Sequence, residues 1–202
     1  MRVTTSSQNI DRLVTIFRAT KRTGRRFVID FYTAEILERL KTYAKLPRAS
    51  WAKIRVCYPQ LLARRFEQLG LDDILVRHRQ NGIKWTRINE IENNVVMLIR
   101  AGFLYDIKRV LGLEGATWIY SLWRGYFERS KPLRKLRAYL KDKGVRYEYL
   151  HTSGHAKLED MKKLVDAIAP EMVIPIHSFH PDKFKVYFPN VRLVDDGEVV
   201  NL

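Results

Sequence analysis

Apolar and polar residues follow one another along the chain in two patterns, one typical of helices and one typical of buried strands. Four apolar residues between positions 10 and 17 share one helical face, and Ser7 or Asn9 precedes them as an N-cap. The same spacing predicts further helices over residues 34–44, 61–69, 103–111, 131–141 and 158–168. Short apolar runs predict strands over residues 26–31, 54–58, 94–99, 117–122, 145–150 and 172–176, followed by a terminal hairpin over residues 191–200.

This succession of elements predicts the fold class. Strands that alternate with helices form a mainly parallel sheet with helices on both faces, so we expect an α/β fold. Ligands of such sheets bind beyond the carboxyl ends of the strands. The sequence contains no internal repeat and no long linker, and the best candidate for a domain boundary lies near Gly144.

Composition indicates a folded protein with a strong positive charge. Of the 202 residues, 46% are hydrophobic and 29% are charged, which is an ordinary globular balance. The formal net charge of +15 favours nucleic acid as a partner, with an anionic membrane surface as the second candidate. Basic residues cluster at Arg18, Lys21, Arg22, Arg25 and Arg26, and again at Lys131, Arg134, Lys135 and Arg137. Each cluster fits a nucleic-acid contact or a solvated face equally well.

Three further features bear on location and partners. Cys57 is the only cysteine, which excludes an intrachain disulfide and a Cys-rich zinc site and fits a reducing compartment. No signal peptide follows Met1, and no apolar run approaches the roughly 18 residues that span a bilayer. The aromatic segment from Trp118 to Tyr126 suits base stacking, although Trp118 and Tyr120 fit a buried strand better. We predict a cytoplasmic protein that does not bind a membrane, and self-association stays open.

The residues with candidate chemistry begin at a loop near the C-terminus. The segment His151-Thr152-Ser153-Gly154-His155 lies between a predicted strand and a predicted helix, whose first backbone N–H groups attract anions. Gly154 allows the backbone to approach a ligand closely, and two imidazoles and a hydroxyl beside it suit a phosphate. The alternative is a tight turn with incidental histidines. A zinc-binding helix is rejected, because Gly154 breaks it and no Glu lies between the histidines.

A further histidine is predicted at the same edge of the sheet. His177 directly follows the apolar run of residues 172–176, so its imidazole is predicted at the carboxyl edge of the sheet. One predicted helix separates it from the His151 loop. A single histidine in this place is usually structural, but two histidine-bearing loops at neighbouring strand ends favour a site. We therefore expect His155 and His177 to lie side by side.

These segments resemble a known family. The C-terminal part of the chain resembles the C-terminal signature of the β-CASP metallo-β-lactamase nucleases. These include ribonuclease J and the cleavage-and-polyadenylation endonuclease. The resemblance rests on the segment HTSGHAKLEDMKKLVDAIAPEMVIPIHS and the later NVRLVDDGEVV. The N-terminal part of the chain resembles the β-CASP insertion of that family, in the segment SSQNIDRLVTIFRATKRTGRRFVIDFYTAEIL. Residues 47–125 match mainly in pattern. The resemblance implies a Rossmann-like β-CASP domain over residues 1–143 and the C-terminal segment of a metallo-β-lactamase fold over residues 144–202.

The resemblance also implies roles for individual residues. His155 corresponds to the catalytic histidine that acts at the scissile phosphate and donates a proton to the leaving group. His177 corresponds to a ligand of one of two zinc ions, and His151, Ser153 and Gly154 correspond to groups that hold a substrate phosphate. Members that act on RNA carry histidine at the position of His177, where members that act on DNA tend to have valine. RNA is therefore the expected partner.

The chain departs from the family in its metal ligands. A complete member carries a His-x-His-x-Asp-His loop, a further histidine and bridging carboxylates. The histidines here are His78, His151, His155, His177 and His180, and they form no such loop. Since a zinc ion usually takes at least three protein ligands, we expect the zinc-binding half on an upstream segment, a split gene product or a partner subunit. Residues 145–200 would then expose apolar surface.

Three functional hypotheses remain at this point. The first is a zinc-dependent ribonuclease-like hydrolase that is active only with the missing half. The second is a catalytically inactive module that binds nucleic acid. The third is a nucleotide-binding Rossmann domain, which ranks last because no Gly-x-Gly-x-x-Gly follows any predicted strand.

Overall fold

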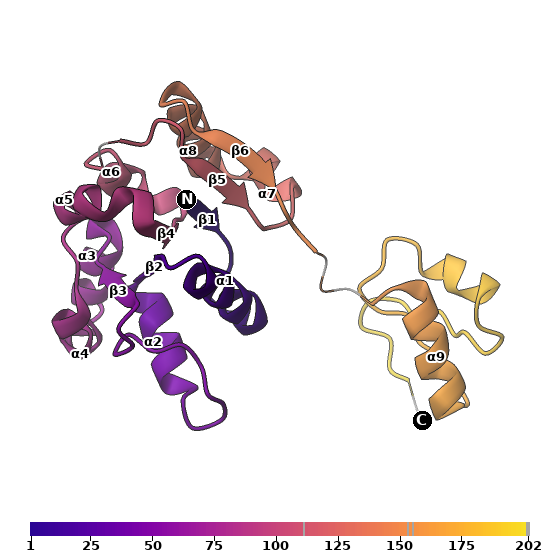
Figure 1. The fold of residues 1–202 in the computed structure, drawn as a ribbon. Helices are drawn as coiled ribbons and strands as arrows, with labels where there is room; N and C mark the ends of the chain where they lie inside the picture. The colour runs from indigo at the N-terminus through magenta and orange to yellow at the C-terminus, as the bar shows by residue number, and fades with distance from the viewer. Residues whose placement is uncertain (111, 153, 155, 201–202) are drawn as a thin grey trace. The chain divides into compact units, whose positions relative to one another are not determined.

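The computed structural model describes residues 1–110, 112–152, 154 and 156–200. The chain divides into two compact units, Met1–Thr152 and Ser153–Leu202. In the first unit, six strands form one parallel sheet in the order β3-β2-β4-β1-β5-β6 (Figure 1). The strands are β1 (Arg2–Thr4), β2 (Arg26–Asp30), β3 (Ile54–Cys57), β4 (Val95–Leu98), β5 (Thr117–Tyr120) and β6 (Arg146–Tyr149). The predicted α/β fold with a parallel sheet is confirmed.

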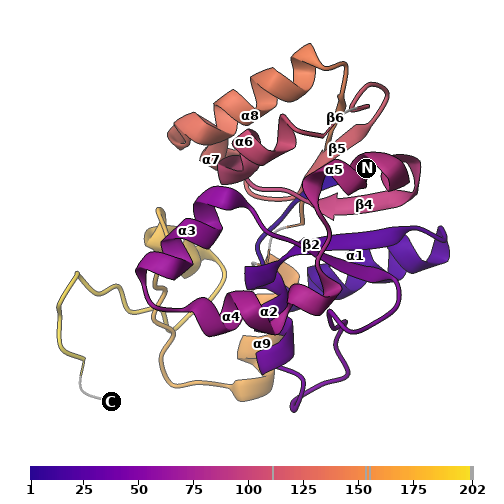
Figure 2. The ribbon, with the colours of Figure 1, turned by 90° about the vertical axis from the view of Figure 1, so that its left-hand side faces the viewer.

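Helices surround this sheet (Figures 1 and 2). The α-helices of the first unit are α1 (Ile10–Arg22), α2 (Phe31–Arg39), α3 (Gln60–Gln68), α4 (Asp72–Arg77), α5 (Trp85–Ile88), α6 (Leu104–Ile107), α7 (Gly125–Arg129) and α8 (Lys131–Asp142). Three 3-10 turns join them, η1 (Arg79–Asn81), η2 (Asn89–Asn94) and η3 (Ala101–Phe103). Asn9 caps α1, because its side chain accepts a hydrogen bond from the Arg12 N–H.

The central strands are buried on both faces, which explains why the sequence shows continuous apolar runs. In β4, Val95 and Met97 pack into one core with residues of α5, α6 and α8. Val96 and Leu98 pack into a second core with residues of α1 and α2. Successive side chains of a strand point to opposite faces, so both faces of this sheet need helices to cover them.

Strand β1 was not predicted, although it lies in the middle of the sheet between β4 and β5. It has three residues, and both Arg2 and Thr4 are polar yet buried. From β1 the chain passes through α1 to β2, toward one edge of the sheet, whereas from β4 it passes through α6 to β5, toward the other edge. The loop after β1 leads to α1 on one face of the sheet and the loop after β4 leads to α6 on the opposite face, so the two loops separate here, at the kind of place where ligands of open α/β sheets usually bind.

The first unit continues beyond the predicted boundary at residue 143, to Thr152. The reason is β6, which pairs with β5 and aligns Trp118 with Tyr147. The rings of these two residues lie 5.3 Å apart at an edge-to-face angle. Backbone pairing and aromatic packing thus hold residues 146–149 in the same sheet as the preceding strands.

The second unit contains α9 (Leu158–Ile168), as predicted, and the 3-10 turn η4 (Pro181–Val186). The predicted strand over residues 172–176 is wrong, since only Val173 forms a bridge, in parallel with Val191. Pro175 lacks an N–H group and cannot continue a ladder. The predicted hairpin over residues 191–200 is also wrong. Its turn forms, with the Glu198 N–H bonded to the Asp195 carbonyl, but no strands flank it among the described residues.

Apolar side chains of the second unit remain in contact with solvent. Leu164 and Ile168 of α9 are 58% and 63% exposed, and Ile176 and Phe179 are 79% and 100% exposed. The predicted exposure of apolar surface in this part of the chain is therefore observed. No helix in the described part of the chain combines the length and the apolar character needed to cross a bilayer.

Candidate nucleic-acid site at the carboxyl edge of the sheet

All six strands end at the same edge of the sheet, and polar residues follow most of them. Asp30 ends β2, Arg100 follows β4, Ser7 follows β1, Ser121 follows β5 and His151 follows β6. Because the strands are parallel, these residues come to one edge despite their separation in sequence. This edge is the candidate functional site of the first unit.

Arg12 on α1 joins the ends of β5 and β6. Its Nη1 donates a hydrogen bond to the Ser121 carbonyl at 2.7 Å and lies 3.4 Å from Nδ1 of His151. Its Nη2 donates to the carbonyl and the hydroxyl of Thr152, at 2.9 and 3.2 Å. One guanidinium thus fixes the start of the His151 loop against the first helix.

This contact restricts the hydrogen bonds that His151 can make. A guanidinium has only donors, so Nδ1 must accept in the Arg12 contact and the proton of a neutral imidazole then lies on Nε2. The ring is half-buried and lies 6.2 Å from the ring of Tyr149. Nε2–H is therefore the group that His151 can offer to a phosphate oxygen.

The structure describes one of the remaining three residues of the candidate site in this loop. Gly154 is exposed, and its part in ligand binding stays a prediction. Ser153 and His155 lie outside the described residues. The expected proximity of His155 and His177 therefore stays a prediction.

His177 does not end a strand, which corrects the expectation for this residue. It is exposed, lies in an irregular segment after Pro175 and has a left-handed backbone with φ of 55°. Among the described residues, no three His, Cys, Asp or Glu side chains group closely enough to hold a metal ion. Since a structural or catalytic zinc needs three or four protein ligands, the described residues alone do not fit a zinc site.

A second polar cluster at this edge was not predicted as a unit. Asp30 is fully buried and caps α2, accepting hydrogen bonds from the Thr33 N–H at 3.0 Å and the Thr33 hydroxyl at 2.8 Å. Arg100 forms an ion pair with Asp30 at 3.0 Å and also donates to Ser7 and Thr33. All these bonds of Arg100 use Nη2. Asp30 thus acts as the N-cap of α2, and the ion pair fixes the loops after β1, β2 and β4.

A cavity of about 520 Å³ opens beside this cluster, between the diverging loops after β1 and β4. Arg100 and the residues Thr4 to Gln8 line it, together with Tyr126. Thr5 is 6% exposed, and its hydroxyl has no hydrogen-bond partner among the described residues. A buried hydroxyl without a partner costs free energy, which a hydrogen-bonding ligand in the cavity would recover.

His78 is a structural residue, as its burial indicates. It is 3% exposed, and its Nε2 lies 3.0 Å from the Glu35 carboxylate, which also pairs with Arg39 and Arg77. Burial tends to raise the pKa of Glu35, but hydrogen bonds from Arg39 and His78 and the charge of Arg77 together lower it below its usual value. The cluster ties α2 to α4 and contributes no group to the carboxyl edge.

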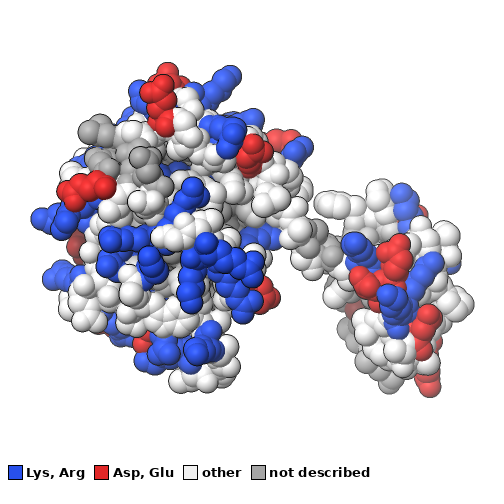
Figure 3. Space-filling view, in the orientation of Figure 1, with Lys and Arg blue, Asp and Glu red and all other residues white. Residues whose placement is uncertain are grey.

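Basic side chains cover the surface around α1. The predicted cluster that begins at Arg18 is exposed at Arg18, Lys21 and Arg22, and Figure 3 shows Lys and Arg side chains gathered on this face of the first unit. The second predicted cluster lies on α8, where Arg137 stacks over the rings of Phe127 and Tyr147 at 5.2 and 4.7 Å. Arg137 therefore has a structural role.

Sequence reasoning missed Arg12 and Arg100. Arg100 carried a usable signal, because it directly follows the apolar run that ends at Ile99, and a charged residue at a strand end often reaches the carboxyl edge. Arg12 carried no comparable signal, since a charged residue on an exposed helix face is ordinary. Its role depends on two strand ends that lie more than 100 residues away in sequence.

Comparison with solved structures supports the class of fold. A crystal structure of a protein of unknown function from Enterococcus faecalis V583 is similar with a TM-score of 0.67 and 19% sequence identity. The similarity covers 98% of this chain and 40% of that one. This chain therefore spans about two fifths of the length of that protein. The likeness establishes a shared α/β fold of the Rossmann-like class and nothing about activity.

Comparison with protein families is more specific for the C-terminal part. Residues 135–182 match the family model RMMBL, the RNA specificity domain of Zn-dependent metallo-hydrolases, which occurs in β-CASP proteins. The match confirms the predicted resemblance and spans His151, Gly154 and His177. The match indicates an RNA specificity domain of the kind found in Zn-dependent metallo-hydrolases in this segment. No curated protein matches the chain.

Proposed function

We propose that this chain is part of a zinc-dependent phosphodiesterase that cleaves RNA, a β-CASP ribonuclease whose zinc-binding half lies outside the chain. The observation that carries the proposal is the match of residues 135–182 to an RNA specificity domain, in a segment that includes His151 and His177. The basic surface around α1 and the net charge of +15 support a polyanionic substrate.

Each candidate residue has a defined part in this proposal. His151, Ser153 and Gly154 bind a substrate phosphate, with Nε2–H of His151 as one donor. His155 gives a proton to the leaving oxygen, a task that suits an imidazole near neutral pH. His177 contributes one ligand to a zinc site that other residues complete. Zinc, when bound, supplies activation of water and stabilisation of negative charge.

Cleavage of labelled single-stranded RNA tests this proposal. The zinc-binding half would be taken from the coding sequence upstream of Met1, where a His-x-His-x-Asp-His motif would identify it in any frame. We expect cleavage only when this chain, the zinc-binding half and zinc are combined. His155→Ala should lower the rate on the order of 100-fold, the lower end of what a general acid contributes.

His180→Ala is the matched control, because it removes an exposed histidine from the same unit. Its rate should stay within about twofold of the parent rate, as expected for a surface substitution away from the site. A complex that binds RNA but never cleaves it would support the alternative, a catalytically inactive nucleic-acid-binding subunit. Preferential cleavage of DNA of the same sequence would contradict the RNA assignment.

Arg12→Met should weaken RNA binding by this chain, because it releases the His151 loop from α1. Loss of the charge-assisted hydrogen bonds that position the loop predicts a decrease in affinity on the order of tenfold. Fluorescence anisotropy with labelled RNA at constant salt would measure it. Arg64→Met removes the same charge from an exposed site on α3, outside both basic clusters, and an equal loss in that variant would show that only net charge matters.

A further inference from the structure

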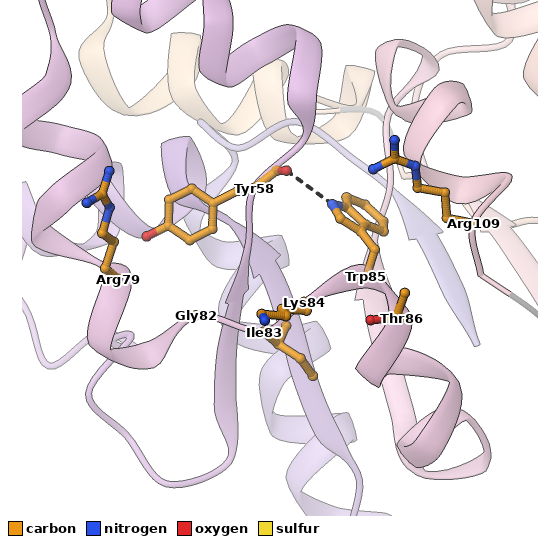
Figure 4. A pocket seen from close by; sticks show the side chains of 8 residues that line it. All are labelled: Tyr58, Arg79, Gly82, Ile83, Lys84, Trp85, Thr86 and Arg109. Carbon is orange, nitrogen blue, oxygen red and sulfur yellow. Dashed lines mark hydrogen bonds between the residues drawn. The ribbon is translucent and has the colours of Figure 1, made fainter.

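A second cavity lies apart from the His151 loop, beside the end of β3. It has a volume of about 600 Å³, in the range of pockets that hold small ligands. Figure 4 shows Tyr58 and Trp85 between Arg79 on one side and Arg109 on the other, with Lys84 below them. Neither the predicted site residues nor the proposed function uses this cavity.

The inner wall of the cavity is held in place by packing and hydrogen bonds. Trp85 is 8% exposed, and its indole N–H donates to the Tyr58 carbonyl at 3.1 Å. The Tyr58 hydroxyl donates to the Leu75 carbonyl at 3.1 Å, and its ring stacks on Phe31 at 5.5 Å. Burial raises the pKa of Tyr58 to about 12, so the phenol stays neutral. The parts of Tyr58 and Trp85 that line the cavity are therefore fixed in position.

The rim of the cavity is positively charged. Arg79, Lys84 and Arg109 line it, and none of the eight lining residues is acidic. No ion pair of these three side chains is found in the described part of the chain. Arg109 is already partly engaged, because it donates a hydrogen bond to the Tyr105 hydroxyl at 3.0 Å and its charge acts on the buried carboxylate of Asp106, whereas Arg79 and Lys84 have no such contact among the described residues. The rim is therefore suited to an anion.

We propose that this cavity binds a nucleotide, with the phosphate held at the rim by Arg79 and Lys84 and the base placed against the wall of Tyr58 and Trp85. Cations without carboxylate partners bind phosphate through charge-assisted hydrogen bonds. Aromatic walls bind any base because every base has a π-face. A free nucleotide and one residue of a single-stranded RNA share this chemistry. The proposal goes beyond the proposed function and does not require zinc or cleavage.

Equilibrium binding to the full chain tests the proposal. Inorganic phosphate and adenosine 5′-monophosphate would be titrated by calorimetry, and labelled single-stranded oligoadenylate by anisotropy. The double variant Arg79→Gln/Lys84→Gln should weaken nucleotide binding on the order of tenfold or more, since each charged hydrogen bond contributes about that factor. The charge-matched control Lys131→Gln/Lys135→Gln, on exposed positions of α8, should change the affinity for the mononucleotide less than threefold, on the order expected of distant screened charges.

The outcomes separate the two sources of the ligand. Variant-sensitive binding of the mononucleotide supports a site for free nucleotides. Variant-sensitive binding of the oligonucleotide alone supports a site for one residue of a strand. Phosphate that binds as tightly as the mononucleotide overturns the proposal, as does an equal loss in the α8 control. Loss of RNA binding in Arg12→Met with normal nucleotide binding here would separate this cavity from the His151 loop.

Gly82→Ala gives a test that leaves the charge unchanged. A Cβ at Gly82 would lie 2.9 Å from the Arg79 carbonyl oxygen and 3.6 Å from the Tyr58 ring. The added methyl group must displace the Arg79 backbone, which moves the rim relative to the wall. We expect weaker nucleotide binding with an unchanged response to salt, and full retention of affinity would overturn the assignment to this cavity.

Discussion

Replacing Arg100 with methionine should lower the free energy of unfolding by about 3–5 kcal/mol, the cost of leaving a buried charge without its partner. Asp30 is fully buried, and Arg100 is the cation that pairs with it, at 3.0 Å. Methionine keeps the apolar stem of the side chain but cannot donate hydrogen bonds to Asp30, Ser7 or Thr33. Urea denaturation at neutral pH would measure the loss.

Two further variants make this result specific to the buried pair. Arg87→Met breaks the ion pair with Glu90, whose two side chains are 69% and 59% exposed, and should cost about 1 kcal/mol or less. Adding Asp30→Asn to Arg100→Met removes the stranded charge and keeps a residue that can cap α2, so part of the stability should return. Equal losses for Arg100→Met and Arg87→Met would contradict the buried pair as a main stabilising contact.

Replacing Trp118 with alanine should have an effect of similar size, about 3–5 kcal/mol, as expected for removing a large aromatic side chain from a core. Trp118 is 1% exposed and contacts the rings of Tyr120, Phe127 and Tyr147. Its indole N–H donates to the Thr4 hydroxyl at 2.9 Å, which ties β5 to β1. Thermal unfolding followed by circular dichroism would detect the change.

Trp123 provides the comparison for Trp118, because the sequence made both residues candidates for base stacking. Trp123 is 51% exposed and packs against Tyr126 at 5.6 Å. Trp123→Ala should therefore cost about 1 kcal/mol or less. A larger loss from Trp123 than from Trp118 would contradict the burial of β5 and return Trp118 to the set of ligand-binding candidates.

Elements with a strong local pattern were predictable, and elements that depend on distant partners were not. The amphipathic repeat of α1 and the apolar run of β4 place both elements correctly. Strand β1 has three residues, two of them polar, and becomes a strand only because β4 and β5 lie on either side of it. Residues 172–176 have the composition of a strand, but a strand needs a neighbour along its length, and here Val173 alone has one.

The candidate site likewise has features that a local pattern predicts and features that depend on distant residues. The loop of His151 and Gly154 was predicted from a local motif, and RNA was predicted from the family resemblance. The family match over residues 135–182 confirms the resemblance, and the roles of the single residues stay predictions. The partners of these residues did not come from sequence, because Arg12 reaches the ends of β5 and β6 only after the sheet has formed. The cavity of Tyr58 and Arg109 likewise joins residues about 50 positions apart.

The amino-acid sequence by itself determined the α/β class, the excess of positive charge and the chemical character of the His151 loop. Each of these depends on residue type and short-range spacing, which any part of the chain carries locally. Only the tertiary structure decided which strand lies at the centre, which cation neutralises Asp30 and which side chains surround each cavity. Those features arise from contacts between residues far apart in sequence, and short-range patterns do not encode such pairings.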